Sequence, residues 1–387
     1  MPPTQNRRNS LVLLLACSTL ALFAGCASVG FDHGTTRLDN KALLFGKMAM
    51  ERDGDRSVIS TFSTSIVLRN IANADEPGLI TQSFEADGSF YWTLAPGHYQ
   101  VSLVLSPYSD GFKSFSFNVP RAGTAYYFGD LTFRGDKRFQ TVSGANIRNV
   151  KAFFQDGLTA AKADLFKKNP QLAGSPVERV ALHDMTQPTQ RWLAYSDVLA
   201  DATPCCRDLA TVNYQALPAS GKQSYSINER SPVYDFPGGR SRFVALELPQ
   251  APTPYGLAIR SVVTPSNLPG TGRLYIFSPE VLLLDRDFKP VAPERNIFFA
   301  AVPASMMPPR SASLQAHLSA TDLAQARYLV LHTSRKAIEM ELNTWRPGVV
   351  PVAGGVLPTG MPASVLMEPA ISGELEITAI PESTPTQ

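Results

Sequence analysis

The sequence carries little charge, and its charges balance. Charged side chains make up 18% of the 387 residues, against about 25% in an average domain. Of the 35 basic residues, Arg7 and Arg8 lie near the N-terminus, and the other 33 equal the 33 acidic residues in number. Without a basic excess there is no electrostatic basis for binding nucleic acid.

Long hydrophobic runs are also scarce. The apolar run of residues 11–23 is shorter than the roughly 20 residues that a membrane-spanning helix needs. It follows Arg7-Arg8 and precedes Ala24-Gly25-Cys26, so the basic, apolar and small-residue regions of an export signal occur in order. We therefore expect residues 1–25 to be a signal peptide.

The end of this segment, Leu22-Phe23-Ala24-Gly25-Cys26, resembles the lipobox of bacterial lipoproteins, although Phe23 stands where that family usually has Leu. The resemblance implies that the thiol of Cys26 receives a diacylglycerol and that the chain carries fatty acyl groups such as palmitate. Several acyl chains anchor a protein stably to a membrane. Ala27 after the cysteine implies sorting to the outer membrane, with residues 26–40 as a tether in the periplasm. A plain secretory signal cut near Ala27 is the alternative.

Cysteines are few. Cys17 lies in the expected signal and Cys26 in the lipobox, which leaves Cys205 and Cys206 for the mature chain. Adjacent Cα atoms are about 3.8 Å apart, below the usual span of about 4.4 to 6.8 Å for a disulfide. The pair could be a strained disulfide, a cross-link between chains or two thiols. No CxxC motif or histidine cluster accompanies it, so we expect no metal and no cofactor.

Proline, by contrast, is abundant: 31 residues exceed the usual share of about 5% and favour short strands over long helices. Seven segments of residues 41–150, separated by turn residues, are predicted to be short strands, and several of them have the two-residue alternation of strands. The seven segments are 43–50, 61–69, 79–84, 89–94, 99–105, 113–119 and 125–133. This density of short strands predicts an N-terminal β-sandwich.

Within this domain, Gly88-Ser89-Phe90, Leu94 and Pro96-Gly97-His98-Tyr99 have a distinctive spacing. It resembles the G-x-F-x-x-x-L-x-P-G-x-Y hairpin of carboxypeptidase regulatory-like, transthyretin-type sandwiches. The resemblance implies an accessory module with a hairpin between residues 89–94 and 99–105.

Residues 151–201 predict a helix and a linker. The helix is expected to have Asp156 as its N-cap and to end at Lys168, because Asn169-Pro170 follows. Pro176 and Pro188 then indicate an interdomain connection.

Residues 202–387 again predict strands, at 243–248, 257–263, 273–277, 281–284, 328–332 and 374–380. Ser319 and Asp322 predict a capping box that opens a short helix. The expected fold is therefore mainly β, with two β-sandwich-like domains and a connecting helix.

Several spaced motifs of this C-terminal part occur together. They are Ser231-Pro232-Val233-Tyr234-Asp235-Phe236, Gly239-Arg240-Ser241-Arg242-Phe243, Phe277-Ser278-Pro279-Glu280-Val281-Leu282-Leu283-Leu284-Asp285, Tyr328-Leu329-Val330-Leu331-His332 and Ser372-Gly373-Glu374-Leu375. Over residues 202–381 their order resembles the MalM family of maltose operon periplasmic proteins. The resemblance implies a periplasmic protein linked to maltose or maltodextrin uptake, without catalytic activity. The simpler members of that family lack the preceding sandwich.

Catalytic signatures are missing. No GxSxG, HExxH, Walker loop or GxGxxG motif occurs, and the five histidines are scattered. His183-Asp184 is interpreted as a solvated polar pair, and Asp285-x-Asp287 has too few further oxygen ligands for a cation site. We expect no enzyme activity and no catalytic or metal-binding residues.

Binding is the better hypothesis. Sugar recognition needs flat aromatic faces and a few planar polar groups on an exposed β surface or loop. Trp345 is the preferred stacking residue because it is expected in a loop, followed by Tyr255 and Tyr275. Four aromatic residues of the first domain could also supply faces: Tyr91, Trp92, Tyr126 and Tyr127. The alternative is an envelope adaptor that binds a protein partner through a sheet edge or through the proline-rich residues 249–254.

Overall fold

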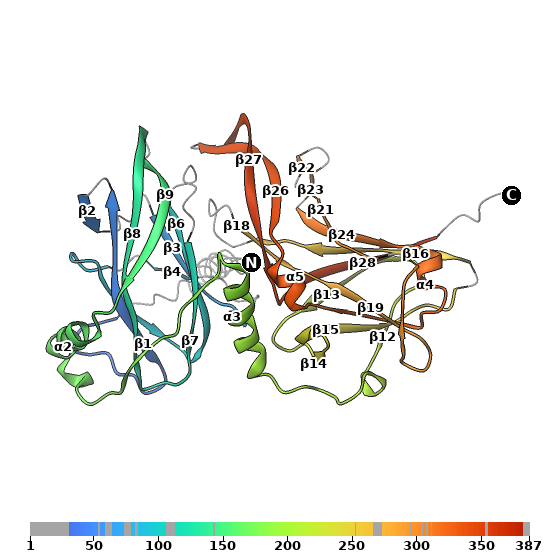
Figure 1. Ribbon diagram of the computed structural model, residues 1–387, viewed down its shortest axis with the longest axis horizontal. Coiled ribbons are helices and arrows are strands. Elements are labelled where there is room, and N and C mark those ends of the chain that lie inside the picture. The colour runs from blue at the N-terminus through green and yellow to red at the C-terminus, as the bar shows by residue number, and fades with distance from the viewer. Residues whose placement is uncertain are drawn as a thin grey trace, which may run out of the picture.

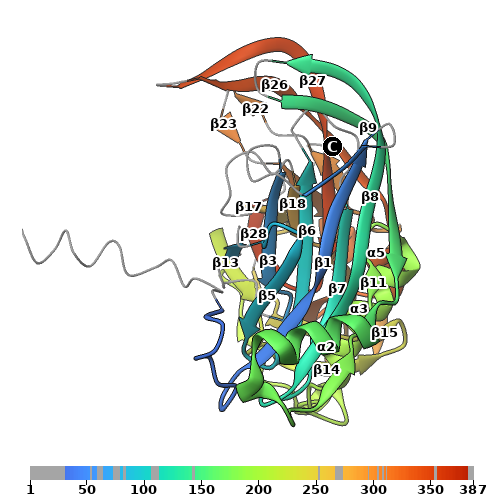
Figure 2. The ribbon, with the colours of Figure 1, turned by 90° about the vertical axis from the view of Figure 1, so that its left-hand side faces the viewer.

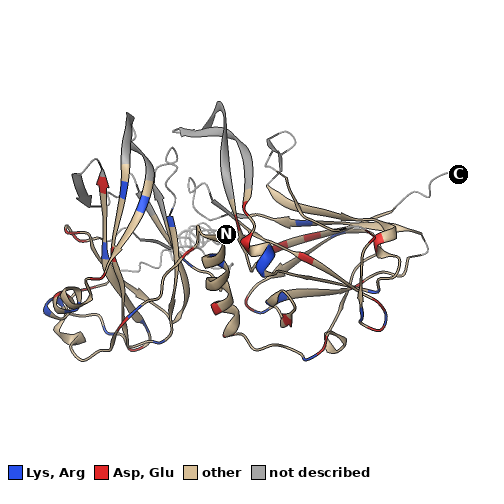
Figure 3. Cartoon of the chain, in the orientation of Figure 1, with Lys and Arg blue, Asp and Glu red and all other residues tan. Residues whose placement is uncertain are grey.

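A computed structural model of the chain describes residues 31–52, 55–58, 64–72, 79–81, 84–105, 113–141, 144–251, 253–265, 273–294, 296–302, 305–306, 309–310, 312–352 and 355–381. Two β-rich halves lie side by side, and the helix α3 (Pro188–Ala200) lies between them (Figure 1). The predicted fold class, mainly β with sandwich-like domains, is confirmed. Basic and acidic residues are interspersed along the chain in both halves (Figure 3). Within the described part of the chain, no helix is both long and apolar enough to cross a membrane.

The N-terminal half contains two sheets. The first consists of β1 (Ala42–Arg52), β2 (Asp55–Val58), β5 (Ser89–Leu94), β8 (Ala125–Thr141), β9 (Gly144–Gln155) and β10 (Val177–Arg179). The second consists of β3 (Thr64–Asn70), β4 (Leu79–Thr81), β6 (Gly97–Leu105), β7 (Lys113–Val119) and β11 (His183–Asp184). The strand orders are β10-β8-β1-β2, with β5 on β1 and β9 on β8, and β11-β7-β6-β3-β4.

The core of this half lies between the two sheets, where alternate residues point inward. On β6 the inward residues include Tyr99 and Val101, and on β7 they are Phe115, Phe117 and Val119. The expected hairpin is wrong, because β5 pairs with β1 whereas β6 pairs with β3 and β7. The chain therefore crosses from one sheet to the other between β5 and β6. Alternation predicts strands, but it does not reveal which strands pair.

The predicted helix forms as α2 (Leu158–Lys168), followed by the short 3-10 helix η2 (Pro170–Leu172). Figure 2 shows α2 lying across the strands of this half. Its N-cap is Gly157 and not Asp156 as predicted. The carboxylate of Asp156 accepts a 2.8 Å hydrogen bond from Arg179, and a Cβ at Gly157 would lie 2.6 Å from the Asp130 carboxylate. A side chain at the cap position would therefore clash.

The stretch predicted as a linker is more ordered than expected. β9 runs to Gln155, beyond the expected boundary at residue 150, β10 extends the first sheet and β11 the second. The sequence does not predict α3, because Pro188 is as typical of a connection as of a helix start. Pro188 lies in the first turn of α3, where its missing N–H would have no partner within the helix anyway.

The C-terminal half contains two main sheets and a ribbon. The first sheet consists of β12 (Gln215–Ala216), β14 (Val233–Phe236), β15 (Gly239–Glu247), β19 (Glu280–Leu284), β20 (Pro290–Val291) and β25 (Tyr328–His332). The second consists of β13 (Gly221–Ile227), β16 (Tyr255–Val262), β21 (Ala300–Val302), β24 (Ser313–Leu318) and β28 (Gly373–Pro381), in the order β13-β28-β16-β24-β21. The ribbon consists of β17 (Thr264–Pro265), β18 (Arg273–Phe277), β26 (Leu342–Val352) and β27 (Gly355–Ala370). Small elements are β22 (Ser305–Met306), β23 (Pro309–Arg310), η3 (Leu209–Thr211), α4 (Ala320–Leu323) and α5 (Arg335–Glu339).

Inward residues of the two main sheets form the second core, with Leu246, Leu331, Ile259 and Ile377 among its buried members. The predicted capping box of Ser319 and Asp322 is confirmed at the start of α4.

Candidate functional site

The five-stranded sheet of the C-terminal half buries one face and exposes polar side chains on the other. On β16, Leu257 and Ile259 are buried in the core, whereas Arg260 lies on the opposite face. On β28, Leu375 and Ile377 are likewise buried, and the residue between them, Glu376, is half-buried on the outer face. The two-residue period of the strands thus places the polar residues of three neighbouring strands on one surface.

Strand register arranges these residues in two rows. Glu376 of β28 and Gln315 of β24 both pair with Arg260 of β16, which stands between them. In the adjacent row, Thr378 and His317 both pair with Ala258. Because the side chain of Ala258 is small, the middle of the second row forms a depression between the polar side chains of Thr378 and His317.

Residues 296–298 form a wall beside these rows. Ile297 and Phe299 pack against the core, whereas Phe298 between them points outward. The side chain of Phe298 is 77% exposed. Together with both rows, this wall lines a groove with a volume of about 470 Å³.

Two cations hold the carboxylate in the groove. Glu376 accepts hydrogen bonds from Lys222 at 2.9 Å and from Arg260 at 3.0 Å. The bond from Lys222 lowers the pKa of Glu376, burial opposes this, and the bond from Arg260 lowers it further. Glu376 is therefore ionised at neutral pH, and its charge is locally compensated.

These groups suit a neutral ligand with many hydroxyls. Glu376 accepts hydrogen bonds, Arg260 donates them, and Gln315 does both. Phe298 offers an aromatic face beside them. The arrangement is thus chemically suited to binding.

The structure places the predicted stacking residues elsewhere. Trp345 was expected in a loop, but it lies within β26 opposite Ser364 of β27, and its side chain is outside the described part of the structure. Tyr275 is buried, with the guanidinium of Arg69 3.4 Å above its ring. The hydroxyl of Tyr255 donates to the carbonyl of Pro249 at 3.0 Å. None of the three lines the groove.

The four aromatic residues considered in the first domain are core residues. Trp92 and Tyr126 lie between the two sheets, and Tyr91 and Tyr127 pack on the α2 side. Because α2 covers the outer face of β5 and β8, rings on both faces of these strands are buried.

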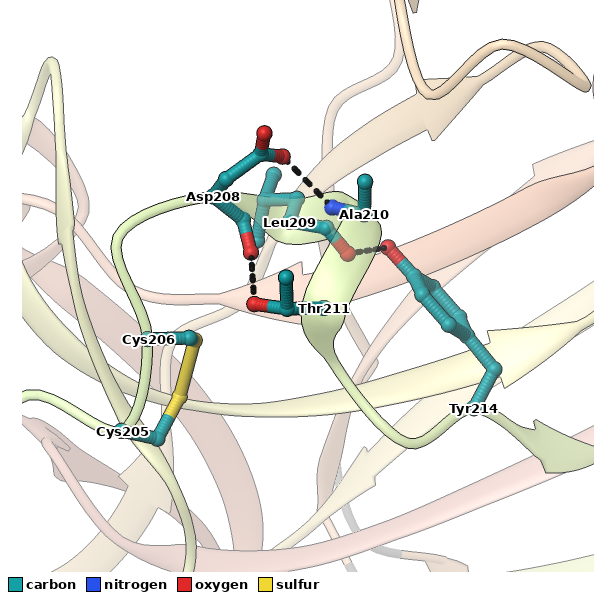
Figure 4. The surroundings of a disulfide bond; sticks show 7 residues. All are labelled: Cys205, Cys206, Asp208, Leu209, Ala210, Thr211 and Tyr214. Atoms are coloured by element: carbon teal, nitrogen blue, oxygen red, sulfur yellow. Dashed lines mark hydrogen bonds between the residues drawn. A yellow bond between two sulfur atoms is a disulfide. The ribbon is translucent and has the colours of Figure 1, made fainter.

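Cys205 and Cys206 form a disulfide between adjacent residues, just before the η3 turn (Figure 4). The N–H of Cys205 donates to the carbonyl of Val233 at 2.8 Å, and Cys206 packs against the cluster that contains Phe236 and Phe243. The disulfide therefore lies beside β14, at the start of the C-terminal half. Cys26 is outside the described residues.

The other polar pairs have local roles. Asp285 accepts hydrogen bonds from the N–H groups of Asp287 and Lys289 in a turn. His183 contacts Gln190 and Asp197 of α3. Within the described residues, no three His, Cys, Asp or Glu side chains gather as metal ligands.

Comparison with protein families supports the resemblance found in the sequence. A family model described as maltose operon periplasmic protein precursor (MalM) matches residues 238–347. The match confirms the predicted similarity to MalM for these residues, which include Arg260, Phe298, Gln315 and His317 of the groove. No curated protein matches the chain.

Sequence reasoning missed the groove for two reasons. Its exposed ring, Phe298, lies inside an Ile-Phe-Phe run that looks uniformly apolar. Its polar residues come from strands separated by more than fifty residues, and only the strand register brings Arg260, Gln315 and Glu376 together. The one local signal was a polar residue between buried ones in each strand.

Proposed function

We propose that this protein is a non-catalytic periplasmic component of maltose or maltodextrin uptake and that it binds the glycan in the groove of Phe298 and Arg260. The similarity of residues 238–347 to MalM supports the periplasmic, maltose-related role. The exposed ring of Phe298 beside two rows of polar groups carries the argument for sugar binding. An aromatic face and planar hydrogen-bonding groups are what a pyranose ring requires.

Calorimetric titration with maltose and longer maltodextrins tests this role. The chain from Ala27 onward keeps every described residue and avoids the expected lipid. Saturable heat should grow stronger along the series, because an open groove contacts more sugar units of a longer chain. Phe298→Ala should weaken binding about tenfold, the equivalent of about 1.4 kcal/mol, and Gln315→Ala should weaken it several-fold.

Two further variants make the test specific. Ile380→Ala removes a partly exposed apolar side chain from the same sheet, outside the groove, and should leave the affinity unchanged. Trp345→Ala tests the site expected from sequence and should also have no effect. Folded protein that releases no heat with any maltodextrin would contradict the proposal.

We also propose that the chain is a lipoprotein of the outer membrane, anchored through Cys26. The lipobox-like segment and the Ala27 that follows it support this location. Cells fed a palmitate analogue should label the protein, and Cys26→Ser should abolish the label and release the protein from membranes. A labelled Cys26→Ser variant would contradict lipidation at this residue.

An envelope adaptor is the second candidate, and β13 favours it. This strand lies at one edge of the five-stranded sheet, and its first four residues are exposed. An open edge can accept a strand from a partner. If no sugar binds, a photo-crosslinker at Gln223 of β13 should join one defined envelope protein in cells, and the same crosslinker at Lys336 should not. Crosslinking from both positions, or from neither, would contradict an adaptor role for this edge.

A further inference from the structure

A second opening lies in the N-terminal half, outside the residues that match MalM. It has a volume of about 830 Å³ and is lined by residues of β7, β8, β9, β10 and β11. Volumes between about 300 and 1,000 Å³ are typical of small-molecule sites. This opening leads from the surface to the core between the two sheets.

Aromatic rings form the apolar wall of this opening. Phe154 of β9 contacts Phe115 of β7 edge to face, with ring centroids 5.0 Å apart, and lies 6.3 Å from the ring of Phe128. Phe154 itself is 43% exposed, whereas Phe115 and Phe128 are buried. Val180 and Leu182 continue the wall. An apolar chain could therefore lie against Phe154 and reach the edge of the core.

Charges at the same opening are unequal. Arg179 is paired with Asp156 at 2.8 Å, and Asp184 accepts hydrogen bonds from the backbone and hydroxyl of Thr186. Lys113 and Lys151 also line the opening, and the side chain of neither has an ion pair or hydrogen bond with any residue that the structure describes. Among the described residues, the lining therefore has three cations, Lys113, Lys151 and Arg179, against the two carboxylates Asp156 and Asp184, so one positive charge is in excess.

We infer that this opening binds an anionic amphiphile, with its alkyl chain along Phe154 and its head group near Lys113 and Lys151. The apolar wall favours the chain, and the two lysines select an anionic head group over a cationic one. A fatty acid and the anionic end of a single-chain lipid share this chemistry.

Calorimetric titration of the chain from Ala27 onward with decanoate tests the site. Decanoate should bind with one-to-one stoichiometry. Its affinity should exceed that of octanoate by up to about fourfold for each added methylene group. Decyltrimethylammonium, which has the same chain with the opposite charge, should bind at least tenfold more weakly. The double variant Lys113→Glu/Lys151→Glu should lose at least tenfold in affinity for decanoate.

Matched variants separate this site from general effects. Lys336→Glu changes a lysine of α5 in the other half and should leave decanoate binding intact. Phe154→Ala should weaken binding, whereas Phe154→Tyr, which keeps the ring, should preserve it, so a folding defect is distinguishable from a lost contact. Phe298→Ala, in the sugar groove, should have no effect. Equal binding of the anion and the cation, no binding of decanoate, or unchanged binding by the lysine variant would each overturn the inference.

Discussion

At the scale of single residues, the most informative side chain is Tyr195 of α3. It is fully buried between the two halves, and its hydroxyl has no hydrogen-bond partner among the described residues. Burial raises the pKa of Tyr195. Because the pKa of Tyr195 is higher in the folded state than in the unfolded state, this residue contributes its full stability at pH values below its unfolded pKa of about 10. That contribution is lost as the pH rises through the folded pKa.

We therefore expect Tyr195→Phe to be neutral or slightly stabilising at pH 7, because it removes an unpaired buried hydroxyl and keeps the ring. Above pH 10 the variant should lose less stability than the original chain. Urea unfolding at pH 7 and between pH 9 and 11 measures both effects. Tyr99→Phe is the control: its hydroxyl donates to Ala95 at 2.9 Å, so its loss should cost about 1 kcal/mol. A Tyr195→Phe variant destabilised as much as Tyr99→Phe would contradict this account.

At the scale of secondary-structure elements, the turn before β5 depends on Gly88. Its φ of +84° is strained for other residues, and its carbonyl accepts a hydrogen bond from the N–H of Met48 in β1. A Cβ at Gly88 would lie 2.5 Å from the carbonyl oxygen of Met48, which belongs to the backbone and cannot move aside cheaply. An Asp-Gly pair such as Asp87-Gly88 is typical of a turn, but only the fold reveals this close approach.

Gly88→Ala should therefore destabilise the chain by about 2 to 4 kcal/mol, the sum of backbone strain and a steric clash. Gly174→Ala is a matched control, because Gly174 has a φ of +103° but a Cβ added to it would meet no atom within 4 Å. It should cost about 1 kcal/mol from strain alone. Denaturant unfolding of both variants gives the comparison, and equal losses would show that the contact with Met48 is unimportant.

At the scale of the whole molecule, the two halves share a core. Ile71 of the N-terminal half, Tyr195 of α3 and Ile371 of the C-terminal half belong to one buried cluster. Polar contacts also cross the interface: Gln100 donates to the buried Glu368 at 3.1 Å, and Arg242 donates to the carbonyl of Ala72 at 2.9 Å. An interface with its own apolar core favours cooperative folding of both halves.

Calorimetry should accordingly show one unfolding transition. Arg191 of α3 donates to the carbonyls of Ile338 and Met340 at 3.0 and 3.2 Å. Arg191→Ala should cost about 1.5 to 3 kcal/mol and separate the melting of the halves. The control Arg335→Ala breaks an exposed pair with Glu339 and should cost about 0.5 kcal/mol or less. Two transitions in the original chain would contradict a shared core.

The same interface explains which parts of the fold could be predicted. Gln100, Ser102, Ser114 and Ser116 alternate with apolar residues, which normally indicates a solvated face of a sheet. All four are buried, because α3 and the C-terminal half cover that face. The candidate sugar site was also missed. The sequence predicts a stacking residue in a loop at Trp345, whereas the exposed ring in the groove is that of Phe298.

The sequence by itself determined many of the strands, the capping box at Ser319 and the similarity to MalM, because each depends on short-range patterns of side chains along the chain. Only the tertiary structure decided that β5 and β6 belong to different sheets, that α3 lies between the halves and that Arg260, Gln315 and Glu376 share one groove. These features depend on strand pairing and burial between distant segments. Such contacts are determined by the free energy of the whole packed molecule, and a local pattern does not reveal them.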